Sequence, residues 1–568
     1  MIKKDEIILR NDREWLHFSK PHRVISTENI HNAGETLLEI ERLVNENHWY
    51  AAGFVSYEAA PAFDSALRVI ESDEFPLLWF GLYDPPQSVQ LPTTVKDFSN
   101  LHWEPTTERS VYNAAITKVK EQIASGKTYQ VNYTMRLQTE FTEDPWEFFL
   151  FMAQTQNKYA AYIDTGRHVI CSASPELFFE LDGEMLTGRP MKGTVKRGRT
   201  TKEDGELANW LHHSVKNRAE NVMIVDMIRN DFGHIAEIGS VHVPQLFTVE
   251  TYPTLLQMTS TVKAKTKAPL AEIFNALFPC ASITGAPKVS TMNIIAELET
   301  TPRKIYTGSI GTIAPNRKAR FNVAIRTALI DRKNNKAEYG VGGGIVWDST
   351  STDEYSEALL KARVLNQRPQ GFSLLETLLW QPESGYFLFE KHLERMADSA
   401  AYFGFEFSPE TLHTHLAALA ENFTSPKRVR VLADRFGSLT SEAKDFHPQE
   451  KPFKITLAQK PIDSQNVFLF HKTTKRDMYP APVYDDILLF NEKEELTEFT
   501  IGNLVIETDE GKFTPPISCG LLGGTFRAHL LETGQISERV IQKDELANCK
   551  AIFLVNSVRG WVKVEPDF

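Results

Sequence analysis

Four clusters in the first 366 residues place polar side chains and glycines where a hydrophobic core would not use them. They are Ser174-Pro175-Glu176-Leu177, Arg189-Pro190-Met191-Lys192-Gly193-Thr194, Arg218-Ala219-Glu220-Asn221, and Gly342-Gly343-Gly344 followed by Glu354 and Glu357. Between them they offer an amine, several carboxylates and open backbone. Such groups are suited to proton transfer and to the binding of ions.

Two of the glutamates have a spacing that suits a metal site. Glu354 and Glu357 are three residues apart, so on a helix they share one face. If Glu220 converged with them, three carboxylates would form the kind of hard-oxygen site that Mg²⁺ uses with substrate oxygens. The alternative is a solvated helix face, which is the commonest position of glutamate. Spacing alone leaves both interpretations open.

The glycine run does not indicate a dinucleotide site. Gly340-Val341-Gly342-Gly343-Gly344-Ile345 lacks the third glycine of the GxGxxG pattern, and a strand-like run follows it. Glycines here would let backbone N–H groups approach an anion, or they would simply form a turn. Lys192 stands between Pro190 and Gly193, which predicts a fixed turn, although most lysines are surface residues.

The C-terminal third has a lysine and a glycine pair of its own. Lys472 follows the apolar run Val467–Phe470. Gly523-Gly524-Thr525 opens a helical run, FRAHLLE. A helix N-terminus with glycines and a hydroxyl is a natural seat for a phosphate group, although a Gly-Gly turn before a helix often serves only as a cap.

The composition excludes several classes of protein. The 568 residues carry a formal net charge of −12, which argues against a general nucleic-acid binder but not against anionic small substrates. Four isolated cysteines without a CxxC pair argue against a disulfide scaffold and a thiolate zinc site. We find no signal peptide and no apolar run long enough to span a membrane, so we expect a cytoplasmic enzyme.

The predicted elements indicate an α+β fold. Residues 168–173 and 177–181 are expected to be strands, and residues 207–228 a helix. Basic residues at the end of a helical run, followed by Pro369, place a domain boundary near residue 368. We expect a first domain over 1–366, in which an N-terminal segment of residues 1–100 precedes a core of residues 110–366. A linker over 367–371 and a second domain over 372–568 would follow.

Six motifs in the first domain together resemble one family. They are Ser174-Pro175-Glu176, Pro190–Thr194, Arg218–Asn221, Ser282-Ile283-Thr284-Gly285-Ala286-Pro287-Lys288, Ala324-Ile325-Arg326 and the triple glycine. In this order they resemble the chorismate-utilising enzymes, which include component I of anthranilate synthase and of aminodeoxychorismate synthase and the isochorismate synthases. The resemblance covers about residues 110–366 and implies layers of antiparallel sheet and helix.

Lys192 discriminates within this family. Aminodeoxychorismate synthases carry lysine in the Pro-x-Lys-Gly-Thr motif, where anthranilate synthases carry alanine. The resemblance therefore implies that Lys192 attacks C2 of chorismate while the 4-hydroxyl leaves, and that ammonia then enters at C4 and expels the lysine. The lysine at position 192 argues against anthranilate synthesis.

The same resemblance implies the other roles in this site. Glu176 would be the acid/base for the departing hydroxyl, and Ser282 a hydroxyl near the ring. The Mg²⁺ ligands would be Glu220, Glu354 and Glu357, and the pyruvyl carboxylate would meet Tyr306, Arg326 and the backbone N–H of Gly344. One position departs from the pattern. Many members have histidine where this chain has Gln257, and a neutral amide cannot act as a general base, so that role is not carried over.

The C-terminal motifs resemble the class IV pyridoxal-phosphate enzymes, a two-lobed α/β fold of fold type IV. The motifs are His392–Met396, Lys472–Arg476, Thr497-Glu498 with Asn503, and Gly523-Gly524-Thr525. The resemblance implies that Lys472 binds pyridoxal 5'-phosphate covalently and that Glu498 pairs with its ring nitrogen. Arg395, Gly524 and Thr525 would hold the phosphate. Arg476 would lie near the cofactor, and Arg559 would meet a substrate carboxylate or be a surface arginine.

The fusion of these halves predicts a bifunctional enzyme that makes p-aminobenzoate for folate synthesis. The first half would aminate chorismate, and the second would act as aminodeoxychorismate lyase and eliminate pyruvate. The C-terminal motifs alone do not separate a lyase from an aminotransferase, and an inactive scaffold is a further alternative. No cysteine lies on a Gly-x-Cys-x-Gly elbow, so ammonia would come from solution or from a separate glutamine amidotransferase subunit. A homodimer through the second domain is also expected, with no nucleic-acid or membrane partner.

Overall fold

The computed structural model describes residues 2–12, 14–72, 74–92, 94, 96–154, 158–365, 371–449 and 451–567. The chain divides into two compact units. One consists of Met1–Val195 with Trp210–Pro369, and the other of Lys196–Asn209 with Gln370–Phe568. Most of the expected linker, residues 367–370, lies outside the described residues.

Two antiparallel β-sheets form the first unit. The first sheet has the order β16 (Gly285–Ala286), β8 (Gln130–Glu140), β20 (Lys336–Ile345), β19 (Thr327–Asp331), β10 (His168–Ser174), β9 (Tyr159–Asp164), β1 (Ile7–Asn11), β2 (Glu14–Phe18) and β6 (Gln87–Val89), with β7 (Glu104–Pro105) beside β8. The second has the order β13 (Met191–Lys196), β15 (Leu255–Lys265), β12 (Met185–Gly188), β11 (Leu177–Asp182), β18 (Lys318–Val323), β17 (Ser309–Ala314), β4 (Tyr50–Val55), β5 (Leu78–Tyr83) and β3 (Arg23–Thr27), with β14 (His242–Thr251) beside β15.

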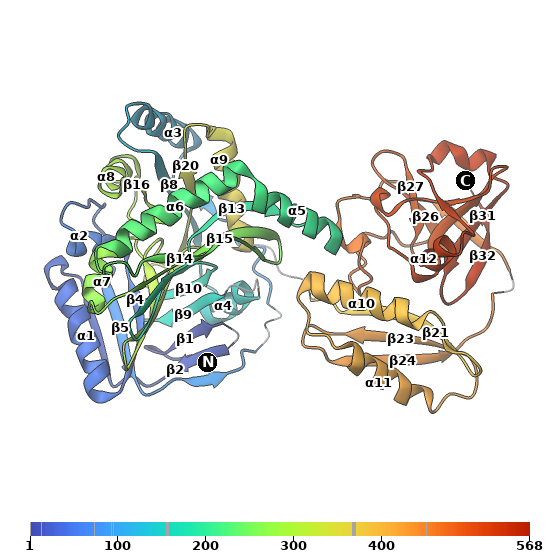
Figure 1. Cartoon of the computed structure of the whole chain (residues 1–568), viewed down its shortest axis with the longest axis horizontal. Helices are drawn as coiled ribbons and strands as arrows, with labels where there is room; N and C mark the ends of the chain where they lie inside the picture. Colours follow the sequence, from blue (N-terminus) through green and yellow to red (C-terminus); the bar gives the residue numbers. More distant parts are fainter. Residues whose placement is uncertain are drawn as a thin grey trace. The chain divides into compact units, whose positions relative to one another are not determined.

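The two sheets face each other across a shared hydrophobic core (Figure 1). From the first sheet it contains Ile7, Phe18, Ile163 and Leu329, and from the second Phe54, Trp79 and Ile310. Burying one such side chain contributes roughly 1.5–3 kcal/mol, so the shared core explains why neither sheet stands alone.

Helices cover the outer face of each sheet. The second sheet packs against α1 (Ala33–Asn47), α2 (Ala60–Phe63), α6 (Val215–Gly233) and α7 (Leu270–Leu277). The first packs against α3 (Arg109–Ala124), α4 (Pro145–Ala153), α8 (Lys288–Leu298) and α9 (Ser351–Lys361). The layers run helix, sheet, sheet, helix, and the predicted α+β class is confirmed.

The first hundred residues contribute strands to both sheets. β1 pairs with β9, where Ile7 lies opposite Ile163, and β4 pairs with β17, where Ala52 lies opposite Thr312. These pairings join segments that are far apart in the sequence. The N-terminal strands therefore lie in the same sheets as the strands beside the motifs that resemble the chorismate-utilising enzymes.

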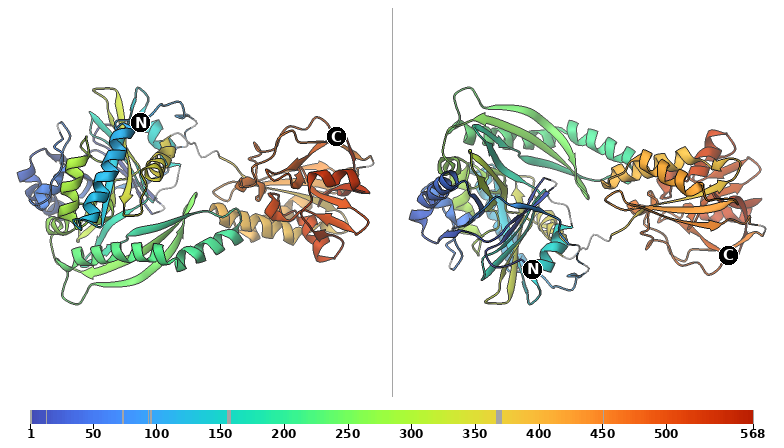
Figure 2. Two further views of the ribbon diagram at one scale, coloured as in Figure 1. Left: turned by 90° about the horizontal axis from the view of Figure 1, so that it is seen from above. Right: turned by 90° about the horizontal axis from the view of Figure 1, so that it is seen from below.

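The local predictions are confirmed for strands and corrected for one helix. The two expected strands correspond to β10 and β11. The single helix expected over 207–228 is wrong, because α5 (Thr201–His213) and α6 are separate helices. Ser214 divides them by capping α6, where its side chain accepts a hydrogen bond from the backbone N–H of Asn217. In Figures 1 and 2, α6 lies along the hairpin of β14 and β15.

The second unit has two lobes (Figure 1). One is a small sheet of β22 (Gly385–Tyr386), β21 (Leu374–Gln381), β23 (Lys427–Ala433) and β24 (Leu439–Asp445), covered by α10 (Phe389–Phe403) and α11 (Pro409–Ala420). The other has the strand order β27 (Leu496–Phe499), β26 (Asp486–Phe490), β25 (Phe453–Leu457), β32 (Gly560–Pro566), β31 (Ala551–Asn556), β28 (Asn503–Glu507), β29 (Lys512–Thr514) and β30 (Ser537–Glu538). An additional pairing of β27 with β28 closes this lobe into a barrel, on which α12 (Thr525–Glu532) packs.

The stretch Lys196–Asn209 belongs to the second unit although it lies within the N-terminal half of the chain. The Tyr402 hydroxyl donates to the carbonyl of Gly198 at 2.6 Å, and the Arg199 guanidinium donates to the carbonyl of Ser464 at 3.2 Å. The second unit is therefore built from two separate stretches of chain. Within the described ranges, no helix is both long enough and apolar enough to cross a bilayer.

Candidate active sites

Lys192 lies on β13, which stands at one end of the second sheet. The next residue, Gly193, has a φ of +97°, a left-handed conformation that glycine adopts without strain. The Asn221 side chain donates to the Lys192 carbonyl at 3.1 Å, and the Gln257 side chain donates to the Gly193 carbonyl at 2.8 Å. The fixed turn predicted around Lys192 is wrong, because Met191–Lys196 form a strand in which only Gly193 departs from extended backbone. Side chains from α6 and β15 hold this part of the strand.

Glu176 lies between β10 and β11 and is buried. The Ser282 hydroxyl donates to its Oε1 at 2.7 Å. Burial raises the pKa of the Glu176 carboxyl to about 7, although the bond from Ser282 and the charge of Lys192 act to lower it. A carboxyl with a pKa near 7 can both donate and accept a proton at neutral pH. Glu176, Ser282 and Lys192, predicted from three separate motifs, therefore lie together.

Glu354 and Glu357 project from α9 toward the triple glycine of β20. A Cβ atom added to Gly343 would lie 3.1 Å from Oε2 of Glu354 and 4.0 Å from Oε1 of Glu357. Burial and the charge of Glu357 raise the pKa of Glu354. Burial also acts to raise the pKa of Glu357, but the Lys361 ammonium 2.8 Å away outweighs it and lowers that pKa. The spacing of the two glutamates predicted that they share one face of a helix. That face of α9 is directed at the triple glycine of β20.

Glu220 does not join these two carboxylates in a cluster. In the part of the chain that the structure describes, no group of three or more His, Cys, Asp or Glu side chains could hold a metal ion. Mg²⁺ commonly uses one or two protein carboxylates and completes its shell with substrate oxygens and water. Two mutually repelling carboxylates beside open glycine backbone fit that requirement, and Glu220 is not needed for it.

The residues predicted to hold the pyruvyl carboxylate are spread over neighbouring elements. Arg326 follows β18 with a φ of 50° and is half-buried, and its guanidinium has no ion pair among the described residues. Tyr306 is buried, and a Cβ atom at Gly340 would lie 2.1 Å from its ring, so that close approach requires glycine. Gly344 lies in β20 opposite Asn132.

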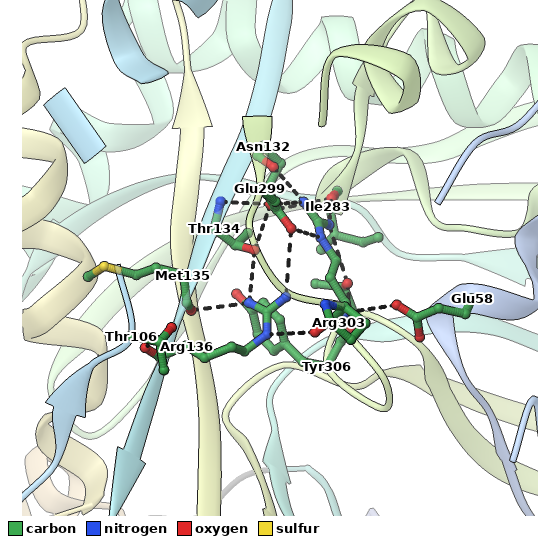
Figure 3. A network of polar contacts seen from close by, with 12 residues as sticks. Glu58, Thr106, Asn132, Thr134, Met135, Arg136, Ile283, Glu299, Arg303 and Tyr306 are labelled. Atoms are coloured by element: carbon green, nitrogen blue, oxygen red, sulfur yellow. Dashed lines mark hydrogen bonds and ion pairs between the residues drawn. The ribbon is translucent and has the colours of Figure 1, made fainter. Parts of the chain in front are cut away.

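A buried ionic network supports Tyr306 and was missed in the sequence (Figure 3). Glu299 accepts hydrogen bonds from the Arg303 guanidinium at 2.7 and 3.0 Å and from the backbone N–H of Thr134 at 2.9 Å. The Arg136 guanidinium lies 5.0 Å above the Tyr306 ring. The four-residue spacing of Glu299 and Arg303 was the only signal, and it does not separate a buried pair from a surface pair.

The second unit brings Lys472 and Glu498 to one cavity of about 380 Å³. Burial, with a smaller effect of Arg395, lowers the pKa of the Lys472 amine to about 8. Burial raises the pKa of Glu498 to about 8. Glu498 accepts hydrogen bonds from the Tyr479 hydroxyl at 2.9 Å and from the backbone N–H of Leu522 at 3.2 Å.

The expected phosphate-binding groups line the same cavity. Gly524 is the N-cap of α12, and a Cβ atom there would lie 1.9 Å from Oδ1 of Asn503. The Thr525 hydroxyl lies 3.2 Å from Nε2 of His392. Arg395 is held by Glu376 through hydrogen bonds of 2.8 and 2.6 Å.

Glu376 was missed in the sequence. Its only signal was a charged residue inside an apolar strand run. Although burial opposes it, the charges of Arg395 and His392 hold the pKa of Glu376 well below its usual range. A buried amine, an acid for a ring nitrogen, and glycine, threonine and arginine for a phosphate together fit pyridoxal phosphate.

Three further arginines line this cavity: Arg428, Arg430 and Arg559. Among the described residues, none of their guanidinium groups has an ion pair, and the charge of Arg428 acts on Arg559 to lower its pKa, second to burial. Arg559 was predicted as a possible carboxylate contact. Arg428 and Arg430 were not, although their i, i+2 spacing on one strand places them on the same face.

The comparisons with known proteins match each half separately. The family described as chorismate binding enzyme matches residues 4–367, and the class IV amino-transferase family matches residues 373–565. Aminodeoxychorismate synthase component 1 of Bacillus subtilis (strain 168) is 40% identical over 254 residues, which cover 44% of this chain and 54% of that protein. The protein of the same name from Escherichia coli (strain K12) is 39% identical over 269 residues, covering 47% and 59%.

The solved structures support the fold of the first unit. Anthranilate synthase component I from Streptococcus pneumoniae TIGR4 superposes with a TM-score of 0.55 at 23% identity and covers 64% of this chain and 92% of that one. The chain spans little more than half the length of the curated relatives.

Proposed function

Because the chain belongs to the chorismate-binding enzyme family and carries a class IV aminotransferase domain, we propose that it makes p-aminobenzoate for folate synthesis in two steps. Residues 1–366, with a core at 110–366, would aminate chorismate, residues 372–568 would eliminate pyruvate, and 367–371 would link them. The observation that supports this proposal is that the charge of Lys192 acts on the buried carboxyl of Glu176, which accepts a hydrogen bond from Ser282 and has a pKa of about 7.

In the first step, the Lys192 amine attacks C2 of chorismate as the bond from C4 to its hydroxyl breaks. Glu176 is protonated for part of the time at neutral pH and supplies the proton that makes the hydroxyl leave as water. Ammonia then attacks C4, and the lysine leaves C2 with its electron pair. Glu354 and Glu357 would hold Mg²⁺, and Glu220, which does not cluster with them here, would become a further ligand when substrate is bound. Arg326 and Tyr306 bind the pyruvyl carboxylate.

In the second step, pyridoxal phosphate supplies an electron sink for carbanion chemistry when it is bound. Glu498 would pair with the ring nitrogen and keep that nitrogen protonated. Lys472, whose pKa is about 8, takes the proton from C4 of the amino-chorismate. Loss of pyruvate then leaves an aromatic ring.

The charge of the second cavity favours a lyase. Arg428, Arg430 and Arg559 offer three cations that have no ion pair among the described residues, and the amination product carries two carboxylates. The other candidate reaction is aminotransfer with a small amino acid, and it would use fewer of these three arginines.

A separate glutamine amidotransferase subunit is the proposed ammonia source, since the name component 1 of the relatives implies a further component. A homodimer through residues 372–568 and a cytoplasmic location complete the proposal. The location is supported by four free thiols.

The test supplies the purified chain with chorismate, Mg²⁺ and ammonium and measures p-aminobenzoate and pyruvate. We expect both products in equal amounts. Lys192→Ala should stop chorismate consumption, and Lys472→Ala should let the amino-chorismate accumulate. If the unaltered chain accumulates the amino-chorismate, the lyase assignment is refuted. If the chain also exchanges amino groups between amino acids and keto acids, the second domain is an aminotransferase instead.

A further inference from the structure

Gln257 is buried on β15 and makes two hydrogen bonds to the residues that directly follow Lys192. Its Nε2 donates to the carbonyl of Gly193 at 2.8 Å, and its Oε1 accepts from the hydroxyl of Thr194 at 2.9 Å. A further contact from Nε2 to the carbonyl of Met258, at 3.2 Å, stays within β15. The donor and the acceptor of one side-chain amide are thus both used on adjacent residues of β13.

A second side-chain amide, from α6, holds the same part of β13. Asn221, which is fully buried on α6, donates to the carbonyl of Lys192 at 3.1 Å. The hydroxyl of Ser260, on β15, donates to Oδ1 of Asn221 at 2.6 Å and fixes that amide. Lys192, Gly193 and Thr194 are therefore each tied by a side-chain amide.

This part of β13 needs such support because of its own geometry. Gly193 has a left-handed φ of +97°, and glycine has more conformational freedom than any other residue. β13 ends its sheet, so a neighbouring strand supports it on one side only. The lysine amine must nevertheless stay near Glu176, Glu354 and Glu357, on whose carboxyls its charge acts.

We propose that Gln257 is a positioning residue. It sets the direction of the Lys192 side chain through its hydrogen bonds to Gly193 and Thr194. This rests on the proposed amination of chorismate. Gln257 moves no proton, because a carboxamide neither gains nor loses one at neutral pH. It acts through the backbone of the lysine, and the acid/base work stays with Glu176.

The test replaces Gln257 with methionine, which keeps the length of the side chain and removes both hydrogen bonds. With ammonium as the nitrogen source, kcat for chorismate consumption should fall about tenfold to a hundredfold, because misplacing a reacting group by an ångström has that effect. The KM for chorismate should change by less than about threefold, since Arg326 is untouched. The pH profile should keep its shape.

Two further variants calibrate this result. Thr194→Val removes only the bond to Oε1 and should give a smaller loss of kcat. Gln245→Met is the matched control, since Gln245 is an exposed glutamine on β14 that accepts from the Thr261 hydroxyl at 3.3 Å. It should leave kcat and KM unchanged. Thermal unfolding of all three should match the unaltered protein to show that the fold is intact.

A chemical readout separates this inference from the proposed function. Limited acetylation with acetic anhydride, followed by mass spectrometry, measures the reactivity of Lys192 relative to an exposed lysine. Gln257→Met should change that reactivity at least about twofold, and Gln245→Met should not. If Lys192→Ala keeps full amination activity, the proposed function fails while the acetylation result still stands. Three results for Gln257→Met would each overturn the positioning role. They are an unchanged kcat with unchanged acetylation of Lys192, a raised KM with a normal kcat, and the loss of one limb of the pH profile.

Discussion

The Ser282 hydroxyl donates a hydrogen bond of 2.7 Å to Oε1 of Glu176, across 106 residues of sequence. The bond favours the ionised carboxylate, and burial favours the neutral acid. Their balance leaves the pKa of Glu176 at about 7. A small change at Ser282 should therefore change the protonation of Glu176 within the working pH range.

Ser282→Ala should move the alkaline limb of the pH profile to higher pH. Removing a bond to the charged form raises the pKa of Glu176 above about 7, and the protonated acid needed for the leaving hydroxyl then persists to higher pH. The measurement is kcat/KM for chorismate against pH at constant free ammonia. Ser290→Ala removes an exposed serine bond, to the Lys127 carbonyl at 2.8 Å, and should move nothing. An unmoved limb in Ser282→Ala would remove Glu176 as the acid.

Glu354→Gln and Glu357→Gln should each raise the Mg²⁺ concentration needed for half-maximal chorismate consumption by about tenfold or more, since each loses one charged ligand. Asp353→Asn, on the same helix but exposed, is the control and should not change the Mg²⁺ dependence. Glu220→Gln decides the third ligand, because a matching rise would place Glu220 in the substrate-bound site. Equal Mg²⁺ dependence in all four proteins would refute the metal assignment.

Arg428→Gln and Arg430→Gln should each raise the KM for the amino-chorismate about tenfold, the value of one lost contact of about 1.4 kcal/mol. The affinity for pyridoxal phosphate, followed by its absorbance, should stay the same, since Arg395, Gly524 and Thr525 remain. Lys444→Gln, on the neighbouring strand opposite Arg428, removes an exposed cation and serves as the control. Loss of cofactor affinity in either arginine variant would instead assign these groups to the phosphate.

Arg303→Met should lower the free energy of unfolding of the first unit by about 3–5 kcal/mol, because it removes the nearest cation from the buried charge of Glu299 and leaves it the more distant Arg136 guanidinium, 3.7 Å away. Both side chains of this pair are at most 3% exposed. Arg42→Met breaks an exposed pair of the same four-residue spacing, with Glu46, and should lower it by less than about 1 kcal/mol. Urea denaturation of the two variants gives the comparison, and equal losses would contradict the structural role of the buried network.

The sequence predicted the relative positions of residues that lie close together on one helix or at its end, because local spacing alone determines those positions. Glu354 and Glu357 share a face because a helix turns once in 3.6 residues, and Gly524 caps α12 because the glycine pair directly precedes a helical run. Motif order, through family resemblance, predicted that Lys192, Glu176 and Ser282 belong to one site. The strands and the α+β class followed from composition and periodicity.

The sequence did not predict partners that depend on how distant strands pair. Glu376 meets Arg395, and Gln257 meets Gly193, only because particular strands and helices pack side by side. It also could not tell that Glu220 stays apart from the other two glutamates, since the distance between two helices is set by the sheets they cover.

The sequence by itself thus determined which residue types are present for amine attack, acid catalysis and phosphate binding, because those are chemical properties of side chains and of their local spacing. The tertiary structure alone decided how those groups are tuned. Burial moved the pKa values of Glu176, Lys472 and Glu498 toward neutrality. Desolvation depends on what packs around a group from every direction, and no single stretch of chain contains that information.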